Sequence, residues 1–89
     1  MNYRLEFTKS ARKEFEKLPD KIRLKTVEAL QLLSQNPQTE WLQIKKIKGA
    51  DYLYRFRVGE YRVVYECRDT VLLILVIKVG HRKEVYRRL

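Results

Sequence analysis

Cysteine and histidine are almost missing from this chain, which has one of each, Cys67 and His81, in 89 residues. A single thiol excludes an internal disulfide, and the opening residues MNYRLEFTKS have the pattern of a strand rather than of a targeting segment. Both features favour a reducing, cytoplasmic environment. One histidine and one cysteine among scattered acids offer no spacing typical of a metal site, so we expect neither a metal nor another cofactor.

Glycines and long apolar runs are scarce too. The three glycines form neither a G-x-G-x-x-G motif nor a P-loop, the common signatures of phosphate-binding loops. The longest apolar run, Val71–Ile77, has seven residues, whereas a membrane span needs ~20. No Ser-His-Asp or Cys-His arrangement is recognisable. Any catalysis by this chain would therefore proceed without a covalent nucleophile of the usual kinds.

Positive charge is plentiful and unevenly distributed. The net charge is +9; eight Lys and Arg stand against six Asp and Glu in residues 1–40, and twelve against five in residues 41–89. A field of this sign attracts phosphate backbones and acidic protein segments. Since 89 residues make one domain, we expect a single domain over residues 1–89 whose C-terminal half binds a polyanion, with RNA as the first choice.

A strand and two helices are predicted before residue 40. Tyr3–Phe7 alternates apolar and polar residues, as a half-buried strand does. A helix capped by Thr8 or Ser10 follows, and Asp20 is the candidate cap of a second helix that stops before Asn36. Helical spacing marks the residues that these two helices bury as Ala11, Phe15 and Leu18, then Ile22, Thr26, Ala29, Leu30 and Leu33. Their short connection at Pro19 predicts an antiparallel helix hairpin.

Strands are predicted in the second half. Tyr52–Val58 alternates, Gly59-Glu60 is a tight-turn signal, and Tyr61–Cys67 is the returning strand of a hairpin. Val71–Val79 is almost wholly apolar, which predicts a central strand covered on both faces and broken by Gly80. The order β-α-α-β-β-β predicts an α+β fold, with the helix hairpin packed on one face of a small, twisted, mainly antiparallel sheet.

Arginines and a tyrosine are the candidates for chemistry. Arg55 and Arg57 are two apart on one strand and so share a face, and Arg62 follows across the turn. Arg82 comes just after the central strand, and Tyr86 follows it. Arginines bind phosphate in a fork geometry, and a tyrosine can stack on a base. Since RNA carries its own nucleophile, the 2′-hydroxyl, such a cluster can support strand cleavage to a 2′,3′-cyclic phosphate without a metal.

Three segments resemble one known family. They are FEKLP at 15–19, RVGEYRVVYE at 57–66 and IKVGHRKEVY at 77–86, and together they resemble the RelE family of bacterial and archaeal toxins, within the RelE/ParE superfamily. The resemblance covers essentially the whole chain and implies a RelE-like toxin domain over residues 1–89. It also implies ribosome-dependent cleavage of mRNA in the A site and neutralisation by a cognate RelB-like antitoxin.

The resemblance also assigns roles to residues of the candidate site. It makes Arg62 the phosphate-stabilising arginine, Arg82 the arginine that assists the leaving group, and Tyr86 the tyrosine that contacts the nucleotide at the cut. Arg55 stands where well-studied members carry a lysine, and Leu53 stands where they carry a second strand lysine. The residues that remain as candidates for binding RNA are Lys45, Lys46, Lys48, Arg57, His81 and Lys83.

Leu53 leaves the general base open, with Lys46, Lys48, Lys78 and His81 as candidates. Two other functions stay open, and Leu53 supports only the second of them. One is inhibition of DNA gyrase, as in ParE-like proteins, which needs no phosphate-binding cluster. The other is an inactive member of the family that only binds antitoxin. Because the C-terminal half is so basic, we expect an acidic or amphipathic antitoxin segment to cover it and to displace the C-terminal tail.

Overall fold

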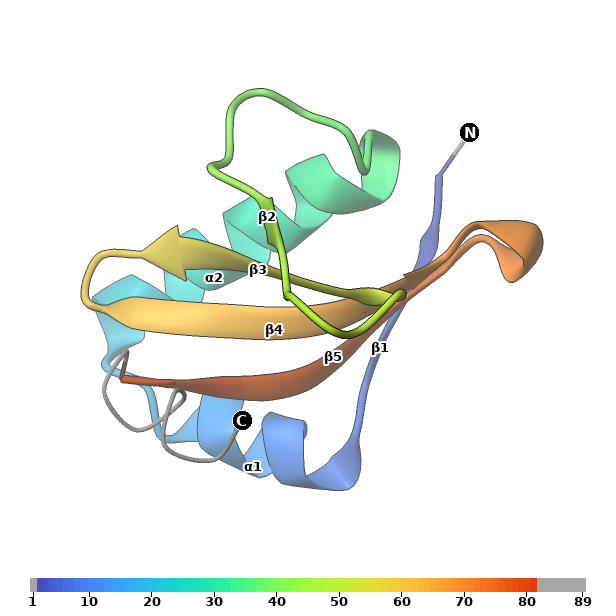
Figure 1. Ribbon diagram of the computed structural model, residues 1–89. Helices are drawn as coiled ribbons and strands as arrows, with labels where there is room; N and C mark the ends of the chain where they lie inside the picture. The colour runs from blue at the N-terminus through green and yellow to red at the C-terminus, as the bar shows by residue number, and fades with distance from the viewer. Residues whose placement is uncertain (1, 82–89) are drawn as a thin grey trace.

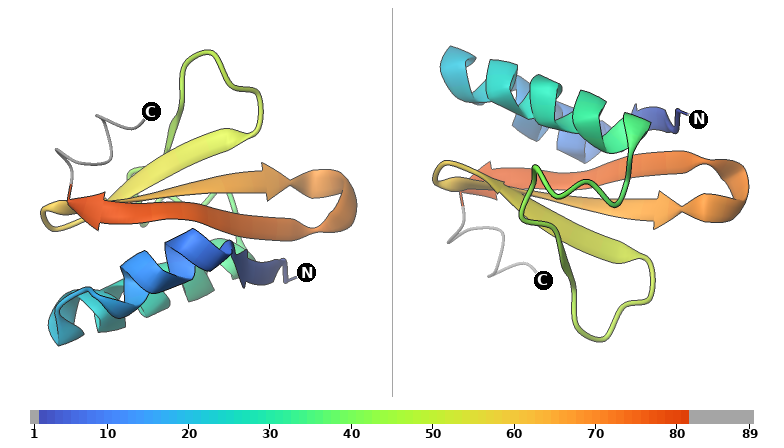
Figure 2. Two further views of the ribbon diagram at one scale, coloured as in Figure 1. Left: turned by 90° about the horizontal axis from the view of Figure 1, so that it is seen from below. Right: turned by 90° about the horizontal axis from the view of Figure 1, so that it is seen from above.

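Two helices lie against one face of a five-stranded sheet in a computed structural model that describes residues 2–81 (Figures 1 and 2). The helices are α1 (Lys9–Glu16) and α2 (Asp20–Gln35). The strands are β1 (Arg4–Phe7), β2 (Lys45–Lys46), β3 (Leu53–Val58), β4 (Tyr61–Arg68) and β5 (Leu73–His81), with a short 3-10 turn at Asp69–Val71. Within the described residues, no helix is long and apolar enough to span a membrane.

The sheet has the strand order β1-β5-β4-β3-β2. β1 pairs with β5 in parallel, and the other three pairs are antiparallel. This confirms the predicted α+β architecture. The basic stretch before Gly49 adds one element to the expected order, because β2 pairs with β3 over Lys45 and Lys46.

The helix starts depend on two different caps. Thr8 caps α1, because its hydroxyl oxygen accepts from the backbone N–H of Ala11 at 3.1 Å, whereas Ser10 lies inside the helix. The predicted cap Asp20 is wrong. Pro19 occupies the N-cap position of α2 in an extended conformation, and Asp20 is the first helical residue, where its carboxylate pairs with Arg23 at 2.6 Å. An acid in the first turn still interacts favourably with the helix dipole.

The core lies between the helices and the sheet. Its fully or nearly buried members are Ala11, Leu18, Ala29, Leu30, Leu33, Phe56, Val58, Val63, Tyr65, Ile74, Val76 and Val79. They include most of the residues that helical spacing predicted, while Phe15 and Ile22 are only half-buried at its margin. Phe56 and Val58 face this core from β3, so Arg55 and Arg57 face away from it.

β5 differs from its prediction at both ends. Val71 belongs to the 3-10 turn and is 56% exposed, and Leu72 has a positive φ of 51° that turns the chain into the strand. The strand begins at Leu73 and runs through Gly80 to His81, so Gly80 does not break it. As predicted, β5 is an interior strand, between β1 and β4. Its coverage is uneven, because Ile74, Val76 and Val79 are buried while Leu73, Leu75 and Ile77 are half-exposed.

Candidate RNA-binding face

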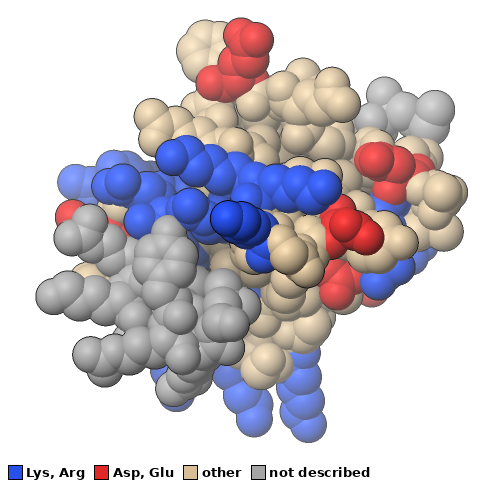
Figure 3. Space-filling model, in the orientation of Figure 1, with Lys and Arg blue, Asp and Glu red and all other residues tan. Residues whose placement is uncertain are grey.

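The sheet face that the helices leave uncovered carries the arginines, and we call it the arginine face, defined by Arg55, Arg57 and Arg62. Arg57 is the cross-strand partner of Arg62 in the β3–β4 pair. Arg55 lies two residues before Arg57, on the same side of β3. Figure 3 shows Lys and Arg side chains gathered in a band across this face. The sequence prediction that these three residues share one face is confirmed by the strand register.

The hairpin turn sets the spacing of the arginine pair. Val58 pairs with Tyr61, so Gly59 and Glu60 form a two-residue loop. Of the two, Gly59 has the positive φ, at +60°, which is the pattern of a turn with glycine at its first central position. Because such a tight loop fixes the register, Arg57 and Arg62 are held as direct neighbours. Arg62 is also 8% exposed, which is unusual for an arginine.

Beside the Arg57–Arg62 pair, a row of paired residues crosses four strands on the same face. Lys45 pairs with Arg55, Arg55 with Val64, and Val64 with Lys78. Val64 is fully buried at the centre of this row. Lys45 is exposed at its β2 end and adds a cation beside Arg55. The row therefore places basic side chains from three strands on either side of an apolar centre.

The remaining basic candidates lie elsewhere. Lys46 follows Lys45 on β2 and points to the opposite side, and it pairs with Tyr54 rather than with an arginine. Lys48 is exposed in the loop between β2 and β3. His81 pairs with Tyr61, whose ring it contacts at 5.8 Å, and the alternation through Val79 puts it on the helix side of the sheet. The structure therefore does not bring His81 together with the arginine pair.

A β-bulge determines which residues of β5 reach the arginine face. The register shifts between Val64 and Tyr65, which pair with Lys78 and Val76, so Ile77 is an extra residue on β5. The alternation of β5 changes side at this point. After the bulge, Val79 faces the core, and Gly80 lies on the arginine face opposite Arg62.

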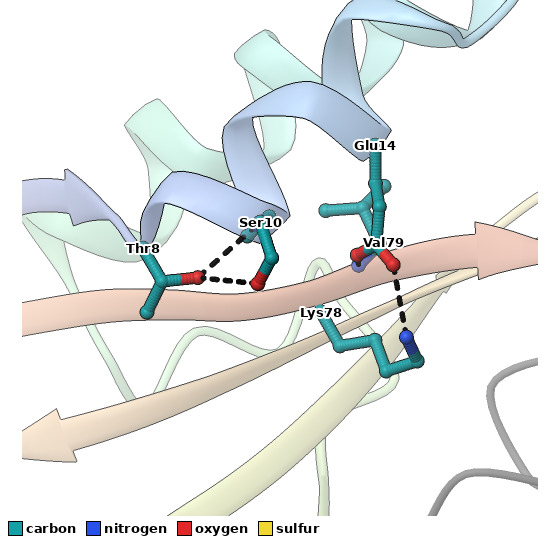
Figure 4. Close-up of polar contacts among 6 residues, drawn as sticks. Thr8, Ser10, Glu14, Lys78 and Val79 are labelled. Atoms are coloured by element: carbon teal, nitrogen blue, oxygen red, sulfur yellow. Dashed lines mark hydrogen bonds and ion pairs between the residues drawn. The ribbon is translucent and has the colours of Figure 1, made fainter.

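Glu14 of α1 binds the two residues that follow the bulge, as Figure 4 shows. One carboxylate oxygen accepts from the backbone N–H of Val79, and the other pairs with the Lys78 amine, both at 2.9 Å. Sequence reasoning missed Glu14. The available signal was its position at the border of the apolar stripe of α1, three residues after Ala11 and four before Leu18.

Three predicted site residues, Arg82, Lys83 and Tyr86, lie outside the described residues. Leu53, which stands where members of the family that the sequence resembles carry a lysine, pairs with Glu66, whose carboxylate binds Arg68 at 2.8 Å. Over residues 2–81, no group of three or more His, Cys, Asp or Glu side chains lies close enough together to hold a metal ion.

A separate groove of about 660 Å³ opens near the start of β1, away from the arginines, and Tyr3, Tyr54, Tyr65, Cys67 and Asp69 are among its lining residues. The Tyr3 hydroxyl donates to Asp69 at 2.7 Å, and this hydrogen bond raises the pKa of Tyr3 to about 12. Burial, then the charge of Asp69, raises the pKa of Cys67 to about 11. The Tyr3 hydroxyl and the Cys67 thiol are therefore protonated and neutral near pH 7.

The fold and the arginine face together define a class, that of small basic α+β proteins with a helix hairpin on one side of a sheet and cations on the other. Comparison with known families makes the class specific. The family described as the ParE toxin of the type II toxin–antitoxin system parDE matches residues 5–86. The match includes both strands of the β3–β4 hairpin that carries Arg57 and Arg62, the arginine hairpin.

Individual relatives point to one branch of that group. Toxin RelG of Mycobacterium tuberculosis is 34% identical over 99% of this chain and 100% of its own. The mRNA interferase toxin RelE of Escherichia coli is 33% identical over 97% of this chain and 92% of its own. A chain in the archaeal RelE–RelB complex from Pyrococcus horikoshii superposes with a TM-score of 0.80 at 29% identity, covering 92% of this chain and 97% of that one. The protein belongs to the RelE family of type II toxins, within the RelE/ParE superfamily.

Proposed function

We propose that the protein is an endoribonuclease that cleaves mRNA on the ribosome, in the A site, and that a cognate RelB-like antitoxin neutralises it. The observation that carries this proposal is the arginine pair Arg57 and Arg62, held side by side on the sheet face opposite the helices in a relative of an mRNA interferase. Paired arginines with Lys45 and Arg55 beside them provide the fork geometry and charge that a phosphodiester requires.

The proposed reaction needs no metal, because the nucleophile belongs to the RNA. The 2′-oxygen forms a bond to the adjacent phosphorus while the bond from phosphorus to the 5′-oxygen breaks. The 2′ proton leaves to a base, and the 5′-oxygen takes up a proton. The products are a 2′,3′-cyclic phosphate and a 5′-hydroxyl end. In this scheme Arg62 and Arg55 stabilise the charge that develops on the phosphorus oxygens, and preorganised cations are effective at that task.

By family resemblance, Arg82 assists the departing 5′-oxygen and Tyr86 contacts the nucleotide at the cut. Among the candidate bases, Lys78 is engaged by Glu14, and the register puts Lys46 and His81 on the other side of the sheet. Lys48, which is exposed in its loop, is the candidate that these contacts leave available. A Lys48→Met substitution that leaves the pH dependence of cleavage unchanged would remove it as the base.

The test is a cell-free translation reaction in which the 5′ ends of the mRNA are mapped by primer extension. We expect cuts at fixed positions within codons that require ribosomes, and Arg62→Lys and Arg82→Ala should lower the rate roughly 100-fold or more. Arg62→Lys keeps the charge but removes the fork, so it separates geometry from charge. Arg12→Gln on α1, on the helix side of the sheet, is the matched control. Intact mRNA with unimpaired translation would reject the proposal.

A second candidate function is inhibition of DNA gyrase, which the ParE description of the matching family favours. It predicts arrested DNA supercoiling with intact mRNA, and Arg62→Lys should then have little effect.

The remaining alternative, an inactive member of the family that only binds antitoxin, predicts no growth arrest when the protein is induced. Leu53, in place of the second strand lysine of well-studied members, is the feature that supports this reading.

For the antitoxin, we propose that an acidic or amphipathic segment covers the arginine face. The relevant support is the charge, because twelve Lys and Arg stand against five Asp and Glu in residues 41–89, and an uncovered surface of that kind binds RNA without selection. Binding should weaken with added salt and with Arg57→Gln. An antitoxin that binds only the helix hairpin and leaves nuclease activity intact would refute this arrangement.

A further inference from the structure

We propose that Glu14 is a positioning residue for the nuclease site, which holds the end of β5 in the register that places Gly80 beside Arg62. This inference rests on the proposed function, because it assigns Glu14 a role in that reaction. Glu14 belongs to α1, which packs on the sheet face opposite the one that carries Arg57 and Arg62. It therefore acts through the strand and does not touch the RNA.

Glu14 binds β5 in the stretch where β1 no longer pairs with it. β1 ends at Phe7, and the last backbone hydrogen bond from that segment to β5 runs from the N–H of Thr8 to the carbonyl of Val76 at 2.9 Å. β5 continues for five residues beyond Val76. The Glu14 carboxylate accepts from Val79 within that stretch, so a side chain takes over the edge where the strand partner stops.

The same stretch contains the bulge, where the register can be lost. A strand that slips by one residue exchanges its two faces. In the native register the residue after the bulge is Lys78, followed by Val79 in the core and Gly80 on the arginine face. A slip would turn Val79 outwards and direct Gly80 to the core. Glu14 binds Lys78 by its amine and Val79 by its backbone, which is the pair of residues that defines this register.

The contact between Glu14 and Lys78 is shielded from solvent, which strengthens its hold on the end of β5. The side chains of Lys78 and Glu14 are 15% and 25% exposed, against 75% and 64% for the Arg12–Glu16 pair on the same helix. Charge-assisted hydrogen bonds in a partly desolvated setting are stronger and less screened by salt than exposed pairs. The strand end that Glu14 fixes carries Gly80 opposite Arg62 and leads directly into Arg82 in the sequence.

The experiment compares Glu14→Ala, Glu14→Gln and Lys78→Met in the full-length protein with Glu16→Ala as the control. Glu16 lies on the same helix, is exposed, and faces Arg12 at 4.0 Å. Ribosome-dependent cleavage is measured as kcat and KM, and the exchange of the Val79, Gly80 and His81 amides is measured by NMR. The fraction of folded protein at the assay temperature is determined for each variant.

We expect Glu14→Ala to lower kcat roughly 10- to 100-fold, as small misplacements of a site do, with KM nearly unchanged and the protein still folded. The Val79 amide should exchange faster in this variant. Glu14→Gln keeps an oxygen acceptor for Val79 and should restore most of the protection and of the rate. Lys78→Met leaves the bond to Val79 in place, so the Val79 amide should exchange more slowly in this variant than in Glu14→Ala.

The inference is overturned if Glu14→Ala cleaves at the normal rate, or if its loss of rate only equals its loss of folded protein. It is also overturned if the β5 amides exchange as in the unmodified protein. Failure of the proposed function is a separate result, because unmodified protein would then leave mRNA intact on ribosomes. In that case the amide exchange alone still decides whether Glu14 fixes the end of β5.

Discussion

Arg57 lies directly opposite Arg62 across the β3–β4 hairpin, on the face of the sheet that the helices leave uncovered. Like charges at directly opposed positions repel each other and lower the stability of a sheet. A bound anion between them removes this repulsion and gains two fork-shaped donors. The proposed nuclease function therefore predicts that phosphate binding at this pair stabilises the folded protein.

Arg57→Gln should make the free protein more stable and the site weaker. We expect the free energy of unfolding to rise by about 0.2–1 kcal/mol, because the repulsion across the hairpin is lost. Urea denaturation in a chloride buffer measures this. In phosphate buffer the original protein should gain more stability than the variant does, because only the original protein keeps both arginines of the proposed anion site. Lys25→Gln, which removes an exposed cation from α2, is the matched control.

The opposite result is informative as well. If Arg57→Gln lowers stability in chloride as much as it does in phosphate, Arg57 stabilises the hairpin by ordinary contacts. The arginine pair would then be no anion site, and the support for the nuclease proposal would weaken.

Gly59 should be sensitive to substitution because of its backbone conformation and not because a side chain would clash with its neighbours. Its φ is +60°, and a Cβ placed there would lie 3.6 Å from the Ile22 Cδ1, which is an ordinary contact. Gly59→Ala should cost about 1–2 kcal/mol, the usual cost of a left-handed conformation for a residue with a side chain. Gly59→Asn should cost less, because Asn tolerates that conformation. Equal losses for both variants, measured by urea denaturation, would indicate a steric cause instead.

The helices and the arginine hairpin were predictable because their signals are local. Helical spacing identified Leu30 and Leu33, and the alternation of β3 with its turn placed Arg57 and Arg62 on one face. The start of β5 was not predictable, because an unbroken apolar run has no alternation to mark its ends. The positive φ of Leu72, which turns the chain into β5, has no sequence signal such as glycine.

The position of Glu14 at the border of the α1 apolar stripe could not by itself identify its partners. Its partners Lys78 and Val79 are 64 and 65 residues away, and no periodic pattern connects them. The bulge that makes these contacts useful depends on the pairing of β5 with β4, which is a tertiary feature. Local patterns therefore predicted the cations of the site and not the group that holds the strand beside them.

Tyr3 should make the stability of the fold depend on alkaline pH. Its hydrogen bond to Asp69 raises its pKa from 10.0 to about 12. The protonated hydroxyl is the form that the folded protein favours, so this stabilisation is complete below about pH 10 and is lost as the pH rises through about 12. Between these values the original protein should lose more of its thermal stability than Tyr3→Phe does. Tyr52→Phe, which changes an exposed tyrosine, is the control, and equal losses in all three proteins would contradict the prediction.

Cys67 should be an unreactive thiol for reasons that can be separated by mutation. Burial is the main cause that raises its pKa from 9.0 to about 11, and the nearby charge of Asp69 adds to it. Since the thiolate is the reactive form, a shift of this size lowers the rate of alkylation by iodoacetamide at pH 8 roughly 100-fold relative to the unfolded chain. Asp69→Asn should speed the reaction of the folded protein only in part, because burial remains.

If Asp69→Asn restores the full rate of the unfolded chain, the charge and not burial protects the thiol. If the folded protein already reacts as fast as the unfolded chain, neither cause operates, and the groove beside Asp69 is more open than its geometry indicates.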